Sequence, residues 1–300
     1  MKNSFNYLFL LISMTIWGSS FVFTKIVLEQ LDPVAVIWIR LVLSLICFYP
    51  IILGGYRKHL AFKKSDLKYF LLLAVFEPFL YFLGENFSLV YLPATLVSLI
   101  IATIPIVSAV VAFLFLKEKL SGINFFGIFL SATGIGLIIL TGDHHDGGEI
   151  HLGGVALGFL SVVSTVFYAA ILKRLVNNYH PLIIIGAQNT LGCLYFTPVF
   201  LWFSDVPAVF QTLASGSYEL WFSLIILAVL GSVVAFLLYS IAIKNIGVGK
   251  SNVFINLIPV VTLFFSFFIL NEKIGFVKIL GTAIVIAGLI FAEKKSKQIV

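Results

Sequence analysis

The feature that most constrains this chain is a series of ten apolar runs, each long enough to cross a lipid bilayer as a helix. The runs lie at 5–28, 34–54, 67–89, 93–116, 124–141, 151–173, 181–202, 219–243, 250–270 and 274–292. Continuous runs exclude a β-barrel, whose strands alternate in polarity at every residue. Only 11% of the residues are charged and 61% are hydrophobic, so lipid must surround most of the chain. We predict an all-α polytopic membrane protein with ten transmembrane helices.

The first run is interpreted as an uncleaved transmembrane helix rather than a signal peptide. It follows Lys2, as a signal sequence would, but bulky Trp17 and Phe21 stand where a cleavage site needs small residues.

The basic residues predict how the helices are oriented. With the N-terminus inside, 15 of the 19 Lys and Arg residues fall in cytoplasmic connections or the C-terminal tail. The outer loops carry acidic residues instead, namely Glu29, Asp32, Asp143, Asp146, Glu149, Asp205 and Glu219. Cytoplasmic loops of membrane proteins are enriched in Lys and Arg. We therefore expect both termini to be cytoplasmic, in the inner (plasma) membrane of a bacterial-type cell.

The chain carries an internal duplication. When the sequence is moved by 154 positions, residues 92–137 lie over 246–291 without a gap, and Pro105 meets Pro259. Gly127 meets Gly281 and Gly134 meets Gly288 by the same displacement. Each half would hold five helices, and because five is odd, the second half must be inserted upside down. Inverted repeats are typical of secondary transporters, whose halves rock around a central site.

The expected organisation follows from this duplication. The first five-helix repeat covers 1–141, and 142–150 forms an outer loop as linker. The second, inverted repeat covers 151–293, and 294–300 is a basic cytoplasmic tail.

Several motifs resemble the EamA family of the drug/metabolite transporter superfamily. Residues 17–21 read Trp-Gly-Ser-Ser-Phe and are followed by Lys25, Pro33 and Arg40, and the Ile104–Pro105 step and Glu118 come later. The resemblance implies two EamA domains around a central cavity, and export or exchange of small metabolites, often amino acids, without ATP. It also implies that the fifth and tenth helices are peripheral. The second half lacks the Trp-Gly-Ser-Ser signature.

Two carboxylates lie within the third predicted helix. A charge at mid-bilayer costs about 3 kcal/mol on the mildest scale, so it should face a cavity or a partner. Glu77 and Glu85 are separated by two helical turns, about 12 Å, with Tyr81 between them on the same face. We predict that Glu77 is a protonatable or substrate-binding group in the cavity. A carboxylate that only braces neighbouring helices is the alternative.

The other candidate residues fall into three groups. Tyr81, Trp17, Gln188 and Asn256 are expected to line the cavity with Glu77, and Tyr168 and Tyr239 are further candidates for aromatic walls. In the second group, Arg40 lies at a membrane depth similar to that of Glu85, which predicts a structural or gating ion pair between them. Lys25 either takes part in gating or extends its ammonium group to the membrane surface. The third group comprises Pro78, Pro105 and Pro259, which are expected to kink their helices.

Other classes of function receive little support. No G-x-x-x-x-G-K-[ST] loop or nucleophile–base set is present, so neither an ATP-driven pump nor an enzyme is predicted, and no cofactor is expected. The loop Asp143–His151 is rich in His and carboxylates but lacks metal-site spacing, so no metal site is predicted.

The sequence therefore predicts a secondary active transporter that works by alternating access, with coupling to protons as a hypothesis. Expected partners are the bilayer, a small-molecule substrate and protons, but not nucleic acid. The alternatives are a multidrug or cation efflux carrier, a passive facilitator and, last, a membrane-embedded enzyme. Substrate, direction, coupling ion, the protonation of Glu77, the resting state and the oligomeric state are left open.

Overall fold

The computed structural model describes residues 2–51, 53–54, 63–116, 122–141, 151–272 and 275–292. Within these ranges all regular structure is helical, as predicted. The helices of the first half are α1 (Lys2–Leu28), α2 (Pro33–Ile51), η3 (Lys64–Asp66), α3 (Leu67–Ala74), η4 (Val75–Leu80), α4 (Tyr81–Tyr91), α5 (Ala94–Ile101), α6 (Ile104–Leu116) and α7 (Gly122–Thr141). Those of the second half are α8 (Leu152–Val176), α9 (Pro181–Phe203), α10 (Val206–Ser215), α11 (Tyr218–Ile225), η6 (Ile226–Val234), α12 (Ala235–Ile246), α13 (Val248–Asn252), η7 (Val253–Leu257), α14 (Ile258–Ile269) and α15 (Phe276–Ala292).

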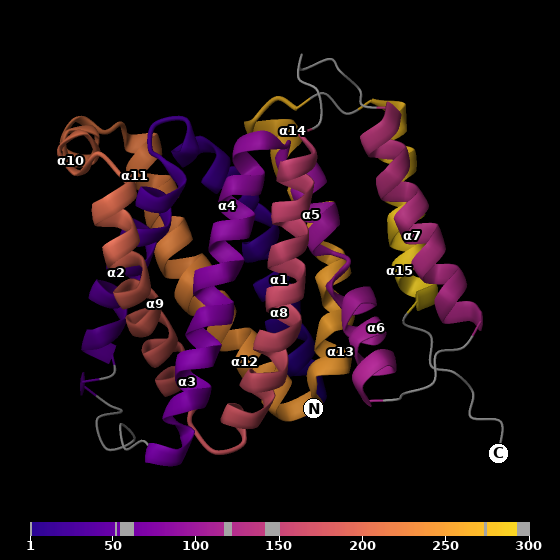
Figure 1. Cartoon of the computed structure of the whole chain (residues 1–300), viewed down its shortest axis with the longest axis horizontal. Helices are drawn as coiled ribbons and strands as arrows, with labels where there is room; N and C mark the ends of the chain where they lie inside the picture. Colours follow the sequence, from indigo (N-terminus) through magenta and orange to yellow (C-terminus); the bar gives the residue numbers. More distant parts are fainter. Residues whose placement is uncertain are drawn as a thin grey trace.

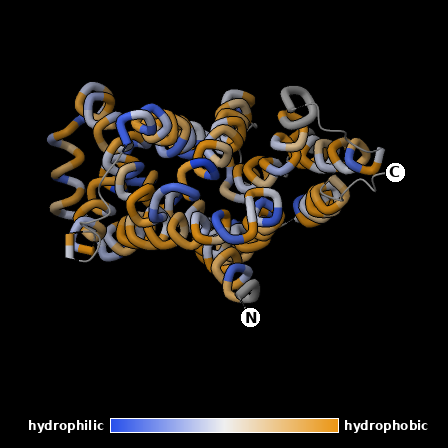
Figure 2. The backbone as a smooth tube through the Cα atoms, turned by 90° about the horizontal axis from the view of Figure 1, so that it is seen from below, coloured by the Kyte–Doolittle hydropathy of each residue, from blue (hydrophilic) through white to orange (hydrophobic). Residues whose placement is uncertain are grey.

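Several of these elements follow one another without a break and form single membrane-crossing rods (Figure 1). Among the described residues, nine rods are long and apolar enough to cross a membrane. The tenth predicted segment is α15, whose 17 described residues make it shorter than the others. The predicted count of ten is therefore not confirmed in full. Seen from below, hydrophobic residues cover most of the outer parts of the bundle (Figure 2), as a lipid-facing surface requires.

One helix was not predicted from the sequence. Helix α10 lies in the connection between α9 and α11, at the upper left of Figure 1, where no helix had been expected. Its start is nonetheless encoded locally, because the Asp205 side chain accepts a hydrogen bond from the backbone N–H of Ala208 (3.2 Å).

The two halves pack on each other as an inverted repeat requires. Helix α1 packs against α12 and α14, and its counterpart α8 packs against α4 and α5. Helix α2 packs against its own counterpart α9, and α7 against α15. The start of α1 and the end of α15 lie at the same end of the bundle (Figure 1).

The clearest sign of inversion lies between α7 and α15. A Cβ on Gly127 would lie 2.6 Å from the carbonyl oxygen of Gly288, and one on Gly134 would lie 2.9 Å from that of Gly281. In the duplication, Gly127 corresponds to Gly281 and Gly134 to Gly288. The two contacts are therefore equivalent, and they require the two helices to run antiparallel. This pair stands at one side of the bundle, as the predicted peripheral position of the fifth and tenth helices implies (Figure 1).

Candidate functional site

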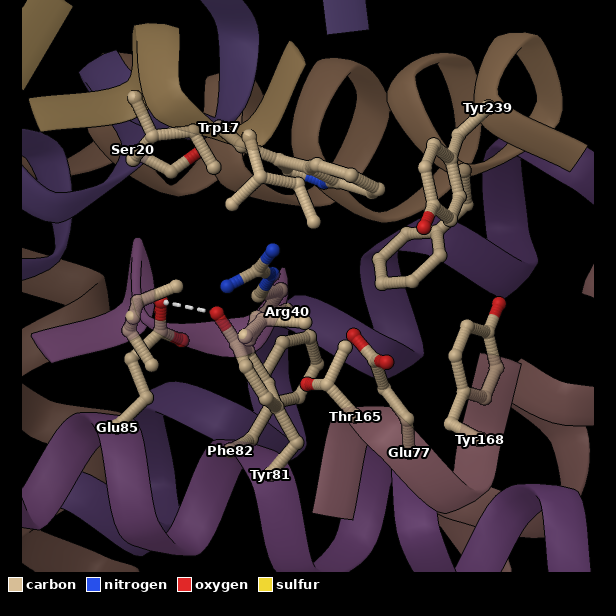
Figure 3. A pocket seen from close by; sticks show the side chains of 15 residues that line it. Trp17, Ser20, Arg40, Glu77, Tyr81, Phe82, Glu85, Thr165, Tyr168 and Tyr239 are labelled. Atoms are coloured by element: carbon tan, nitrogen blue, oxygen red, sulfur yellow. Dashed lines mark hydrogen bonds between the residues drawn. The ribbon is translucent and has the colours of Figure 1, made fainter. Parts of the chain in front are cut away.

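A cavity lies inside the bundle, between the two halves. Its polar and aromatic lining is shown in Figure 3. The lining residues are Trp17, Ser20, Arg40, Glu77, Tyr81, Phe82, Glu85, Ile101, Ile104, Thr165, Tyr168, Phe236, Tyr239, Ile255 and Ile258. They come from α1, α2, η4, α4, α5, α6, α8, α12, η7 and α14. None comes from the peripheral helices α7 and α15.

Glu77 reaches the cavity from a break in the helical backbone. Its own backbone is extended (φ −147°, ψ 119°), within the π-helical segment η4. Proline disfavours the α conformation in the residue before it, so Pro78 accounts for this break. The hydroxyl of Ser164 in α8 donates to the carbonyl of Phe76, and that of Ser161 donates to the carbonyl of Tyr81 (2.9 Å). These bonds from the other half satisfy backbone acceptors on both sides of the break.

The second half contains a matching irregularity. The π-helical segment η6 occupies the third rod of that half, as η4 does in the first. There the indole Nε1–H of Trp17 donates to the carbonyl of Gly231 (3.3 Å). In both halves, therefore, the first rod of one half hydrogen-bonds to the π-helical region in the third rod of the other.

The carboxyl groups and the guanidinium all face the cavity, but they do not form the expected contact pair. Arg40 Nε donates to Ser232 Oγ (2.6 Å), and the guanidinium lies over the Phe82 ring, 4.2 Å from its centroid. Glu85 Oε1 accepts from the Tyr81 hydroxyl (3.3 Å), whereas Oε2 is buried without a hydrogen-bond partner. Among the described residues, no direct ion pair joins Arg40 to Glu85 or to Glu77. The three groups share one cavity and interact across it.

Aromatic rings from both halves line the cavity. The Trp17 ring meets Phe236 and Tyr239 edge-on, with centroids 5.0 and 5.1 Å apart. The Tyr168 hydroxyl donates to Gln188 Oε1 (3.1 Å), and that of Tyr239 donates to Asn252 Oδ1 (2.9 Å). The buried amides thus orient the tyrosines that line the cavity.

The structure brings together most of the predicted site residues. Trp17, Arg40, Glu77, Tyr81 and Glu85 all line the cavity. Gln188 lies behind Tyr168 instead of lining the space, and Asn256 is half-buried in η7 and is not among the lining residues.

Lys25 and the three predicted kink prolines are not among the lining residues. Lys25 is partly exposed and interacts electrostatically with Glu272 and Glu29. The helical rods are interrupted immediately before Pro105 and Pro259, between α5 and α6 and at η7, and at Glu77–Pro78. The His-rich loop 142–150 lies outside the described residues.

The small and apolar lining residues were not predicted from the sequence. Ser20 belongs to the Trp-Gly-Ser-Ser-Phe motif, which gave a signal for it. Phe82 directly follows Tyr81, and Thr165 lies one helical turn before Tyr168. Phe236 and the isoleucines carry no signal that separates them from the many other apolar residues.

The fold and the cavity define a polytopic membrane protein with two inverted repeats around a polar and aromatic chamber. Residues 4–140 and 152–293 match the model of the EamA-like transporter family. The chain belongs to that family.

Several curated transporters are similar to this chain, at low sequence identity. An uncharacterized transporter of Archaeoglobus fulgidus is 24% identical over 96% of this chain and 99% of its own length. The uncharacterized transporter YetK of Bacillus subtilis is 26% identical over 97% of this chain and 88% of its own. A probable terminal-alkyne amino-acid exporter of Streptantibioticus cattleyicolor is 25% identical over 70% of this chain and 68% of its own. One crystal structure matches with a TM-score of 0.69 at 12% identity, covering 96% of both chains, and supports the fold alone.

Proposed function

We propose that this protein is a secondary active transporter that exports or exchanges small metabolites such as amino acids by alternating access. The family supports transport in general. The cavity supports the mechanism, because it lies between two inverted repeats that can rock about it.

The observation that carries the mechanism is the position of Glu77. Its side chain is only 4% exposed and lines the cavity from an interrupted helix, and it makes no hydrogen bond to another described residue. A buried carboxyl without a fixed partner is able to exchange a proton or a cationic group when the surroundings change. We assign it the coupling role, with protons as the coupling ion. Arg40, Glu85 and Lys25 are assigned to gating.

Amino acids are proposed as substrates on two grounds. One relative is named as a probable amino-acid exporter. The lining also offers both signs of charge beside aromatic rings, which suits a small zwitterion with an apolar side chain. A cation carrier is the second candidate, and the excess of two carboxyl groups over one guanidinium in the lining favours it.

The proposed setting is the plasma membrane, with both termini in the cytoplasm. The distribution of Lys and Arg supports this orientation. The repeat boundaries are proposed at 1–141 and 151–293, with 142–150 as linker and 294–300 as tail.

The most direct test compares metabolites released by cells with and without the protein. Cells that express the wild type should accumulate specific small molecules outside, whereas cells that express Glu77→Gln at equal level should not. If both strains release the same metabolites as cells without the protein, the proposed function is wrong. If the released molecules are cations without a carboxylate, the second candidate is correct.

A further inference from the structure

The guanidinium of Arg40 is held in place but uses few of its donors. It is 3% exposed, and its Nε–H bond to Ser232 Oγ is its only hydrogen bond to the described residues. Arginine stays charged in proteins and carries five N–H donors, so the terminal nitrogens have unused capacity. Figure 3 shows the guanidinium in the middle of the pocket, between Trp17 above and Tyr81 and Glu77 below.

The structure around Arg40 fixes the direction of these free donors. Ser232 Oγ donates in turn to the carbonyl of Leu227 (3.1 Å), and Asn189 Nδ2 donates to the carbonyl of Ser232 (3.1 Å). The Phe82 ring supports the flat face of the guanidinium. Gly231 leaves room for it, since a Cβ there would lie 3.0 Å from Arg40 Nη2. A guanidinium that is held in place while most of its donors are unused is typical of a preorganised anion site.

The nearby carboxyl groups do not fill this site. Glu85 is engaged with Tyr81 through Oε1, its buried Oε2 has no partner, and no direct ion pair to Arg40 occurs among the described residues. The cavity therefore holds an anion-binding fork and two carboxyl groups, Glu77 and Glu85, that make no direct ion pair with it in the described part of the chain. A zwitterion complements both.

We propose that Arg40 binds the carboxylate of the transported molecule, so that this residue selects substrates that carry a carboxylate. This inference rests on the proposed transport function and adds the residue that selects the substrate. The apolar part of the substrate packs on the rings of Phe236, Tyr239 and Trp17, the last of which already contacts the other two edge-on. Arg40 is then a binding residue rather than only a member of a gate.

Binding to the purified protein tests this directly. The probes are alanine, leucine and phenylalanine, each with its amide, which lacks the carboxylate charge, and with its decarboxylated amine. Dissociation constants come from titrating the melting temperature with each probe. We expect at least one of the three amino acids to bind, and its amide and amine to bind about tenfold more weakly or worse, because charged hydrogen bonds are lost.

Variants separate the guanidinium from general damage. Arg40→Lys should weaken binding of the amino acid about tenfold and leave the weak binding of the amide unchanged. Ser232→Ala, which keeps the charge but removes the brace, should weaken it less and serves if Arg40→Lys does not fold. Arg174→Lys is the matched control, because Arg174 also lies over an aromatic ring, 4.1 Å from the Tyr69 centroid, but outside the cavity.

The outcomes are distinct from those for the proposed function. Equal affinity for amino acids, amides and amines would overturn the role of Arg40 and would leave the proposed transport function intact. Failure of all three amino acids to bind would have the same meaning. Carboxylate-dependent binding without release from cells would support the Arg40 site and contradict the transport function.

Discussion

The carboxylate of Glu272 accepts a hydrogen bond from the hydroxyl of Thr95 (2.9 Å). Its other oxygen accepts the backbone N–H of Ala94 (3.1 Å), so the loop between α14 and α15 caps the start of α5. Lys25 of α1 interacts electrostatically with the same carboxylate. One acidic side chain therefore joins the two halves, and any motion that separates Glu272 from the start of α5 must break these contacts.

Replacing Glu272 with Ala should loosen the start of α5. Loss of a helix cap costs about 1 kcal/mol, and here it also removes a tie between the halves. Hydrogen exchange of the amides in 94–101 should become faster. Glu29→Ala is the control, because Glu29 also interacts with Lys25 but does not cap α5. Equal exchange in both variants would contradict the role of Glu272 as a tie.

The contact between α7 and α15 should tolerate no added methyl group. In Gly288→Ala the new Cβ would lie 2.4 Å from the Ser131 nitrogen, so the helices must separate. Overpacking of this kind typically costs about 1–3 kcal/mol, which should lower the melting temperature by several degrees. Gly136→Ala is the matched control on α7, since nothing lies within 4 Å of its added Cβ. A Gly288→Ala variant as stable as this control would show that the contact is loose.

Glu77 should be sensitive to a change on the neighbouring helix α9. A Cβ on Gly192 would lie 2.2 Å from Pro78 Cγ and would push the residue that follows Glu77. We expect Gly192→Ala to reduce transport severalfold without touching the cavity. Gly249→Ala, with open space around its added Cβ, should transport normally. Normal transport by Gly192→Ala would mean that the position of Glu77 is not held by this contact.

The sequence predicted well what hydropathy and charge determine. Long apolar runs and the shared displacement of Pro105 and Pro259 were enough for the helical class and the repeat. The cost of burying charge also placed Glu77, Glu85 and Arg40 at the cavity, even though the helix is not regular at Glu77.

The partner of each buried polar side chain, and whether that side chain faces the cavity, could not be predicted in the same way. Gln188 and Asn256 were expected in the lining because polar groups avoid lipid. A polar group also avoids lipid behind another side chain, as Gln188 does behind Tyr168, where its Oε1 accepts a hydrogen bond and its Nε2 is buried without a partner among the described residues. The Arg40–Glu85 pair was expected from equal depth alone. Ser232, whose π-helical backbone the sequence does not reveal, receives the Arg40 hydrogen bond instead. Helix α10 was missed because its 10 residues are too short for a spanning run.

The most direct test of the central claim is transport by Glu77→Gln in proteoliposomes across pH, with the substrate found in the metabolite comparison. We predict that the wild type accumulates substrate when a proton gradient is imposed. The variant should lose this accumulation and its pH dependence while still exchanging labelled for unlabelled substrate, and Glu29→Gln should behave as the wild type. Unchanged accumulation and pH dependence in Glu77→Gln would remove this carboxyl group from the mechanism.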